Sequence, residues 1–261
     1  MIMGKIKNYF MRIKTWVLLF PMPFREIYKW HDRLLNAVPT EDLTRFQEFK
    51  SRGGIYPRTL GSDYQKFFQD GGIDLLASVD EVEDKNVIVL GGYLGDSVDR
   101  YLKQGARTID VFEPVPEYYE KLDCRFQNVS QVNLIDKAAW IRNEALEFWL
   151  DNDGTGFSGR TGKAIKVEAI SLSSWLSRQE KDQKYFIEIN IEGSEYELLE
   201  DLISSGMANR LATILVQFHN FSPESELQRA HIRGKLAKSH SEKMNYKWVW
   251  EKWTLKATVD K

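Results

Sequence analysis

Glycine and carboxylate residues at two strand ends have the types and spacing that suit a nucleotide-like cofactor. A run of four apolar residues leads directly into Gly91 and Gly92, and Gly95 opens a segment of helical character. This order of strand, glycine turn and helix is typical of nucleotide-type cofactor sites. The next short strand, 108–112, ends on Glu113. In such folds an acid at this place can receive the two hydroxyls of a ribose.

A second group of polar residues follows the strand predicted at 185–191. Asn190 and Glu192 come at its end, and Glu195 begins the helix after it. Ligands of open α/β sheets bind beyond the carboxyl ends of the strands, so these side chains are expected at the same edge as Glu113. Glu195 has an alternative interpretation, in which its carboxylate only complements the dipole of the helix.

His219 is the histidine best placed for chemistry. It lies at the end of the strand predicted at 212–220, whereas His31, His231 and His240 lie in polar, helix-like or loop segments and are expected to be solvated. The alternative for His219 is a hydrogen-bonded structural histidine. Carboxylates with one histidine at irregular spacing are weak evidence for a metal ion, and no metal is predicted.

Alternating strands and helices in the second part of the chain must position these groups. Their spacing, which includes a strand at 131–140, implies parallel strands joined by right-handed crossovers, hence an α/β, doubly wound, mostly parallel sheet. Two antiparallel strands are predicted at 144–150 and 163–170; the glycine-rich loop between them is either flexible filler or a part that closes over a ligand. The tail, 245–256, is expected to form a closing hairpin that turns near Glu251, or one edge strand.

Two predicted segments precede this domain, which is placed at 86–261. Residues 1–33 carry basic residues interleaved with apolar ones, and the spacing puts the apolar groups on one helical face. This segment is expected to pack on the domain or on a second copy of the chain, as in a homo-oligomer; contact with a membrane surface is the alternative. Residues 34–85 are predicted to form a helical lead-in.

Composition excludes several classes of protein. The formal net charge of -2 gives no overall attraction to nucleic acid, so no nucleic-acid partner is expected. A single cysteine rules out an internal disulfide framework and favours a cytoplasmic setting, peripheral to a membrane if residues 1–33 bind one. No apolar run approaches the roughly 20 residues of a spanning helix. The apolar stretch 16–24 is broken by prolines and lacks a small-residue cleavage site, so a signal peptide is not predicted.

A family resemblance follows from the order and spacing of the motifs VIVLGGYLGDS, VFEP, DKAAW, VEAISLSSWL and INIEGSEYELLEDL. Together they resemble the FkbM-type S-adenosylmethionine-dependent methyltransferases. The resemblance implies a class I methyltransferase fold, which is Rossmann-like with a seven-stranded sheet whose last strand is antiparallel. It also implies O-methylation, commonly of a sugar hydroxyl, so the expected partner is a glycan or another small hydroxylated acceptor.

The glycine turn agrees with S-adenosylmethionine as the cofactor. Leu90 occupies the first glycine position of the dinucleotide fingerprint, which argues against a nicotinamide-dependent oxidoreductase. S-adenosylmethionine has no phosphates, and its cationic sulfonium and ammonium suit an acidic rim of Asp96, Glu113 and Glu192. The predicted cofactor contacts are Gly91, Gly92, Tyr93, Gly95, Asp96 and Ser97, then Glu113 and Pro114 at the ribose, Lys137 and Ala138 beside the adenine, and Asn190.

Methyl transfer to a hydroxyl benefits from a base, because the hydroxyl loses a proton as it attacks. His219 is the first candidate and Glu192 the second, since both are expected at the rim. The chain departs from the family pattern at Val89, Glu188, Asn190 and Ser173, where the family usually has Asp, Lys, Asp and Asp. These departures leave open an alternative function, that of a non-catalytic binding or scaffold protein with a methyltransferase fold.

Overall fold

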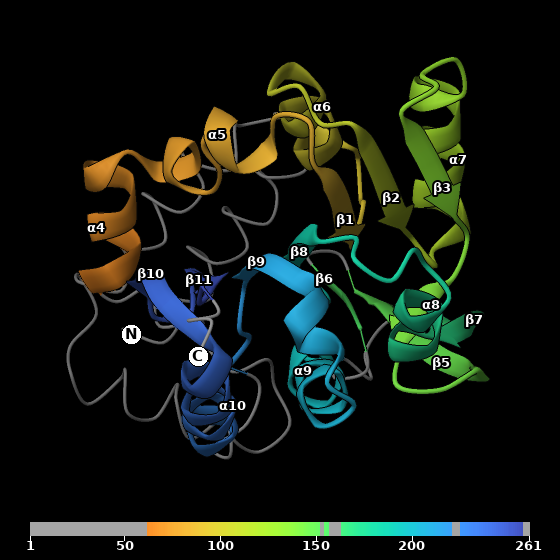
Figure 1. Ribbon diagram of the computed structural model, residues 1–261. Helices are drawn as coiled ribbons and strands as arrows, with labels where there is room; N and C mark the ends of the chain where they lie inside the picture. The colour runs from red at the N-terminus through yellow and green to blue at the C-terminus, as the bar shows by residue number, and fades with distance from the viewer. Residues whose placement is uncertain (1–61, 152–153, 157–162, 221–224, 258–261) are drawn as a thin grey trace, which may run out of the picture. The chain divides into compact units, whose positions relative to one another are not determined.

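A seven-stranded sheet forms the centre of the computed structural model, which describes residues 62–151, 154–156, 163–220 and 225–257 (Figure 1). The predicted segment 1–33 and the lead-in as far as residue 61 lie outside the described residues. The strand order is β10-β11-β9-β8-β1-β2-β3. These strands are β1 (Asn86–Leu90), β2 (Thr108–Phe112), β3 (Val132–Ile135), β8 (Tyr185–Ile189), β9 (Leu211–Val216), β10 (His240–Tyr246) and β11 (Trp250–Leu255).

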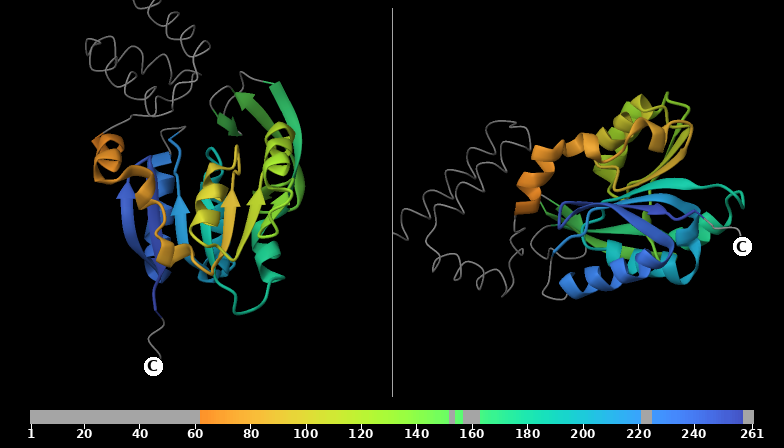
Figure 2. Two further views of the ribbon diagram at one scale, coloured as in Figure 1. Left: turned by 90° about the horizontal axis from the view of Figure 1, so that it is seen from above. Right: turned by 60° about the vertical axis from the view of Figure 1, so that its left-hand side comes forward.

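The directions of the strands confirm the expected α/β, mostly parallel sheet. The neighbours from β3 to β9 are all parallel, and β11, the last strand of the chain, is antiparallel to both β9 and β10. In Figure 2 the blue strands β10 and β11 lie at one edge of the sheet and the yellow β1 lies nearer its middle. From β1 the chain continues to β2 and β3 on one side, and it later returns to β8 on the other side of β1. Open α/β sheets bind ligands where the strand order reverses in this way.

The apolar residues of β1 point alternately to the two faces of the sheet, which explains why this strand is central. Ile88 and Leu90 belong to the buried cluster on one face of the sheet, whereas Val87 and Val89 belong to the cluster on the other face. A strand that is covered on both faces is apolar throughout, as this one is. The apolar run before the first glycine therefore contributes residues to the hydrophobic cores on both faces of the sheet.

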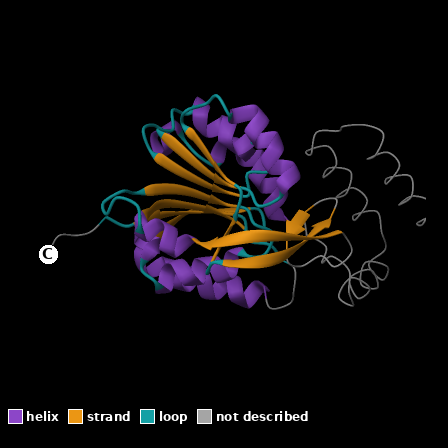
Figure 3. Ribbon diagram, turned by 90° about the vertical axis from the view of Figure 1, so that its right-hand side faces the viewer, coloured by secondary structure: helices purple, strands orange, loops and turns teal. Residues whose placement is uncertain are grey.

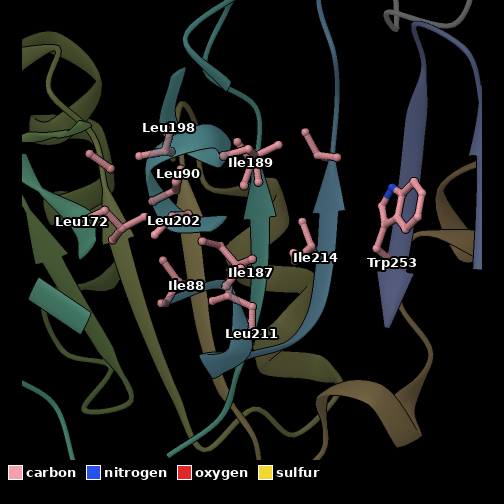
Figure 4. Close-up of a cluster of buried hydrophobic side chains, with 14 of the residues drawn as sticks. Ile88, Leu90, Leu172, Ile187, Ile189, Leu198, Leu202, Leu211, Ile214 and Trp253 are labelled. Atoms are coloured by element: carbon pink, nitrogen blue, oxygen red, sulfur yellow. The ribbon is translucent and has the colours of Figure 1, made fainter. Parts of the chain in front are cut away.

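Helices cover both faces of the sheet (Figure 3). Leu172, Leu198 and Leu202 meet β1 and β8 on one face (Figure 4). Val98, Tyr101 and residues of the helices before and after them pack on the other face. The first layer contains α8 (Leu172–Ser177), α9 (Glu195–Ser204) and α10 (Ser225–Ser239), and the second contains α4 (Ser62–Asp70), α5 (Val79–Val82), α6 (Asp96–Lys103) and α7 (Pro116–Phe126); two 3-10 helices are η1 (Gly72–Leu75) and η2 (Met207–Arg210).

The described part of the helical lead-in packs against the sheet. Phe67, Leu76 and Val82 are buried in the same cluster as Val87 and Val89. All described residues belong to one compact unit, Arg58–Lys261. No helix in the described part of the chain is long and apolar enough to cross a membrane.

A second, four-stranded sheet holds the predicted antiparallel pair. Its order is β4-β7-β5-β6, and the pairing of β5 with β7 confirms the prediction for 144–150 and 163–170. The single strand predicted at 131–140 is wrong. Its first half is β3 and its second half is β4, and the two halves pair in different sheets, with a bend at Lys137 between them. The strands are β4 (Ala138–Trp140), β5 (Glu144–Asp151), β6 (Gly154–Gly156) and β7 (Lys163–Ser171).

The tail forms the predicted hairpin, but the turn is not near Glu251. Tyr246 pairs with Trp250, and Trp248 in the turn has φ +62°. Glu251 lies inside β11, where it is buried and forms ion pairs with arginines of α10. Pairing with β9 fixes this register, and a pattern of tryptophans alone does not reveal it.

His240 is also placed differently from the expectation. It is buried at the start of β10, where its Nε2 lies 3.0 Å from the carbonyl oxygen of Leu211. Burial lowers the pKa of His240, although that hydrogen bond opposes the effect. His231 is solvent-exposed, as predicted, with 59% of its side chain accessible. His31 lies outside the described residues.

Candidate functional site

The carboxyl ends of four neighbouring strands form one edge. Their last residues are in register, because Leu90 pairs with both Phe112 and Ile189, and Ile189 pairs with Val216. Backbone bonds continue the ladder past the strand ends. They run from Gly91 N to Phe112 O (3.0 Å), from Asn190 N to Leu90 O (3.1 Å) and from Gln217 N to Ile189 O (2.9 Å). The loops after these strands therefore begin at one level.

The glycine turn must be glycine for steric reasons. Gly91 has φ +86°, and a Cβ on it would lie 2.3 Å from the carbonyl oxygen of Asn190. Gly95 has φ +88°, and its Cβ would lie 2.5 Å from the ring of Phe126. A Cβ on Gly92 would meet Val111 at 2.5 Å. These glycines let the loop lie directly against the end of β8 and against α7.

Replacing Gly91 with alanine is expected to lower the free energy of unfolding. The positive φ alone costs about 1–3 kcal/mol for an L-residue, and the contact with Asn190 O adds to it. Gly234→Ala is the matched control, because nothing lies within 4 Å of the added methyl in α10, and alanine is favoured over glycine in a helix by about 0.5–1 kcal/mol. Urea unfolding measures both; equal stability of Gly91→Ala and wild type would contradict this view of the turn.

Glu113 is buried beneath the glycine turn. Its Oε2 accepts a hydrogen bond from Tyr93 N (2.8 Å) and its Oε1 accepts one from Val115 N (2.9 Å). Burial raises the pKa of Glu113, and the two backbone donors partly offset that rise. An ionised carboxylate has about four acceptor positions, so each oxygen can accept a further hydroxyl. Glu113 thus has free acceptor positions that could bind the two hydroxyls of a diol.

Tyr93 is the exposed part of the same loop. It has φ +48° and is 52% exposed, and its ring packs edge-on against Tyr118 at a centroid distance of 4.8 Å. Pro114, which follows Glu113, is half-buried. An exposed Tyr93 whose backbone N–H binds the buried carboxylate of Glu113 is consistent with the predicted cofactor contacts, whose roles stay predictions.

Asn190 presents an unsatisfied acceptor at the centre of this edge. Its Oδ1 is buried and has no hydrogen-bond partner among the described residues. A buried carbonyl oxygen without a donor is uncommon in proteins. A cationic ligand group with N–H donors, such as an ammonium, matches this atom.

His219, Glu195 and Glu192 form a buried charged cluster at the ends of β8 and β9. Glu195 Oε1 accepts a hydrogen bond from His219 N (2.6 Å) and lies 3.2 Å from its Nδ1. Glu195 Oε2 accepts one from Gly193 N (2.8 Å). On the other side of the ring, Nε2 lies 3.4 Å from Glu192 Oε1. Glu195 thus does more than complement the dipole of its helix.

The charge of this cluster bears on which residue can act as a base. Burial by itself lowers the pKa of His219, but the carboxylates of Glu195 and Glu192 outweigh it and raise the pKa to about 9. At neutral pH the ring is therefore an imidazolium that cannot accept a proton. Glu192 is the more accessible partner, with 20% of its side chain exposed and φ +51°. This geometry favours Glu192 over His219 as the proton acceptor.

The other predicted contacts are placed less centrally. The Asp96 side chain is 90% exposed and pairs with Arg125 of α7. Lys137 pairs with Glu168 on β7, and Ala138 is buried in the second sheet. Among the described residues, no group of three or more His, Cys, Asp or Glu side chains is arranged to hold a metal ion.

Sequence reasoning missed the partners of Glu188. This carboxylate is buried under α6 and binds Arg100, Tyr101 and the hydroxyl of Ser97, a residue predicted as a cofactor contact. The only available signal was helical spacing, which places Ser97 and Tyr101 on the same face of α6.

The strand order with its antiparallel last strand, together with a glycine turn and an acid at the ends of the first two strands, defines a class I methyltransferase. The family model described as the methyltransferase FkbM domain matches residues 90–247, more than half of the chain. The chain belongs to this family of S-adenosylmethionine-dependent methyltransferases, which confirms the resemblance. A search of curated proteins finds no match.

The solved structures that this chain is similar to share little sequence with it. The methyltransferase FkbM from Methylobacillus flagellatus KT is 12% identical over 66% of this chain and 43% of its own, with a TM-score of 0.45. This chain thus spans less than half of that protein. The N-methyltransferase NodS from Bradyrhizobium japonicum WM9, in complex with S-adenosyl-L-homocysteine, is 9% identical over 82% of this chain and 98% of its own, with a TM-score of 0.40.

Proposed function

We propose that this protein is an S-adenosylmethionine-dependent O-methyltransferase that acts on a hydroxyl of a glycan or another small hydroxylated acceptor. The observation that carries the proposal is the acidic edge of the sheet. Glu113 lies at the end of β2, and Glu192 and the unsatisfied Asn190 Oδ1 lie at the end of β8, on either side of β1 and its tight glycine turn. This edge attracts a cation and offers acceptors to hydroxyl and ammonium donors.

The residues at this edge fit the proposed cofactor. Glu113 would bind the ribose hydroxyls, Asn190 Oδ1 would accept from the ammonium group, and the turn at Gly91 would leave room for the amino-acid end. When bound, S-adenosylmethionine supplies a methyl group on a positively charged sulfur. Alignment of acceptor and methyl is worth about 7–11 kcal/mol at best, so binding and orientation supply much of the rate.

Glu192 is proposed as the base that takes the proton of the acceptor hydroxyl. Its carboxylate lies at the rim, and the imidazolium of His219 holds it from the buried side at 3.4 Å. Glu195 in turn fixes the ring through Nδ1 and through the backbone N–H of His219. His219 thus orients the base, and the proton passes to Glu192 instead of to the ring.

Two of the four departures from the family pattern, Val89 and Glu188, lie away from this edge. Val89 and Glu188 are register partners on neighbouring strands, and both are buried on the α6 face of the sheet. These two departures change the packing between the sheet and α6, beneath the glycine turn. They do not remove the hydrogen-bond acceptors at the rim. This supports the catalytic interpretation over a scaffold protein.

Glu192→Gln tests the proposed chemistry. Loss of a positioned base is expected to lower the rate about 10²- to 10⁴-fold, while cofactor affinity falls much less than the rate does. Glu197→Gln is the matched control, because Glu197 lies exposed in the first turn of α9. The assay is mass-spectrometric detection of methylated product from a panel of free sugars and glycans. Methylation at nitrogen alone, or full activity of Glu192→Gln, would refute the proposal.

A further inference from the structure

A buried carboxylate beneath α6 plays no part in the proposed chemistry. Glu188 on β8 is 3% exposed, and its carboxylate accepts hydrogen bonds from Arg100 Nη2 (2.8 Å), the Ser97 hydroxyl and the Tyr101 hydroxyl. All three donors come from the single helix α6. A buried charge is stable only when it is paired and hydrogen-bonded, and here every partner is on that helix.

The position of Glu188 links α6 to the glycine turn. Glu188 is the register partner of Val89, one residue before the end of β1. The loop 91–95 starts where β1 ends, and α6 begins at Asp96 with Gly95 as its N-cap. Attachment of α6 to Glu188 therefore fixes both ends of the loop relative to each other.

A second attachment holds the same loop from the solvent side. Arg125 of α7 donates to the carbonyl oxygen of Leu94 and pairs with Asp96 and Asp99. Its side chain is 35% exposed. Exposed ion pairs contribute little because water and salt screen them. The inner attachment at Glu188 is therefore the stronger of the two.

We propose that Glu188 is a positioning residue for the cofactor. It acts through α6 on the loop 91–95 and does not touch the cofactor itself. The inference rests on the proposed function, because it concerns the loop that would bind S-adenosylmethionine. Its test must therefore separate loop positioning from general stability and from cofactor binding as such.

The protein supplies a matched control for the carboxylate. Glu251 on β11 is also buried, and it is held by Arg229 (2.6 Å) and Arg233 (2.5 Å) of the single helix α10. Glu188→Gln and Glu251→Gln thus remove the same charge from similar strand-to-helix attachments. Both variants are expected to unfold at lower temperature than wild type.

A second pair of variants, which each remove a single hydroxyl, provides the same test if the glutamine variants do not fold. Tyr101→Phe removes one hydroxyl from Glu188 and keeps the ring against Phe186, at a centroid distance of 5.3 Å. Tyr246→Phe removes the hydroxyl that donates to Asp70 (2.6 Å) and keeps its ring against Phe67, also at 5.3 Å.

The measurements are the Kd of S-adenosyl-L-homocysteine, by calorimetry below all unfolding transitions, and amide hydrogen exchange without ligand. Glu188→Gln is expected to raise the Kd by roughly 5- to 150-fold, the usual range for coupling between separate groups, and to speed exchange in residues 91–99. Tyr101→Phe should act in the same direction with a smaller effect. Glu251→Gln and Tyr246→Phe should leave both readouts unchanged.

The outcomes distinguish this inference from the proposed function. A wild-type protein that binds no S-adenosyl-L-homocysteine would overturn both. If wild type binds, and Glu188→Gln and Tyr101→Phe bind equally well with unchanged exchange in 91–99, the positioning role of Glu188 is refuted and the proposed function stands. Equal losses of affinity in the Glu188 and Glu251 variants would also refute it, because the effect would then reflect stability alone.

Discussion

Glu113→Ala is expected to abolish measurable binding of S-adenosylmethionine in titration calorimetry. The carboxylate is the proposed acceptor of both ribose hydroxyls, and hydrogen bonds to a charged group contribute about 1.5–3 kcal/mol each. The change also leaves the N–H groups of Tyr93 and Val115 without their acceptor. Each unsatisfied buried group costs about 1–3 kcal/mol, so the glycine turn loses its support as well.

The Glu113 prediction has two controls. Glu113→Gln keeps one acceptor oxygen and the shape of the side chain, so it should bind more weakly than wild type but more tightly than Glu113→Ala. Glu147→Ala removes an exposed carboxylate from β5 and should bind as wild type does. Circular dichroism shows whether each variant is folded. Unchanged affinity in a folded Glu113→Ala would contradict the assignment of this residue to the ribose.

The free energy of unfolding is expected to fall as the pH rises from about 6.5 to about 9. The pKa of His219 is 6.5 in the unfolded chain and about 9 in the folded protein, where burial is outweighed by Glu195 and Glu192. The folded state therefore binds a proton that the unfolded state releases in this window. The stabilisation is complete below pH 6.5 and is lost as the pH passes 9. At about 1.4 kcal/mol per pKa unit, it amounts to about 3 kcal/mol.

Substitution of single histidines shows which histidine causes this pH dependence of stability. His219→Gln should lose the fall in stability between pH 6.5 and 9, whereas His231→Gln, at an exposed position, should keep it. His240 acts in another range, because its lowered pKa makes it destabilising only as the pH falls below 6.5. Urea unfolding at a series of pH values measures the effect. A flat profile in wild type, or the same profile in His219→Gln, would show that the ring is not held as a cation.

Features set by local sequence could be predicted. The apolar run of β1, the glycine turn at Gly91 and Gly95 and the acid after β2 depend on neighbouring residues, and all appear at the expected places. The ends of parallel strands meet at one edge by topology alone, which is why Glu113 and Glu192 could be assigned to the same rim before any distance was known.

Features set by distant partners could not be predicted. The bend at Lys137 depends on which sheet each half of 131–140 joins, and the buried state of His240 depends on a carbonyl of β9. Glu188 shows this most clearly. As a single residue it is a departure from the family pattern, and only the fold brings Arg100 of α6 to it.

The edge formed by Gly91, Glu113 and Asn190 is proposed to bind S-adenosylmethionine. The most direct measurement is calorimetric titration of the wild-type protein with this cofactor. A saturable heat with one site per chain, lost in Glu113→Ala and kept in Glu147→Ala, is the predicted result. An absence of heat at millimolar cofactor, with the protein folded, would contradict it.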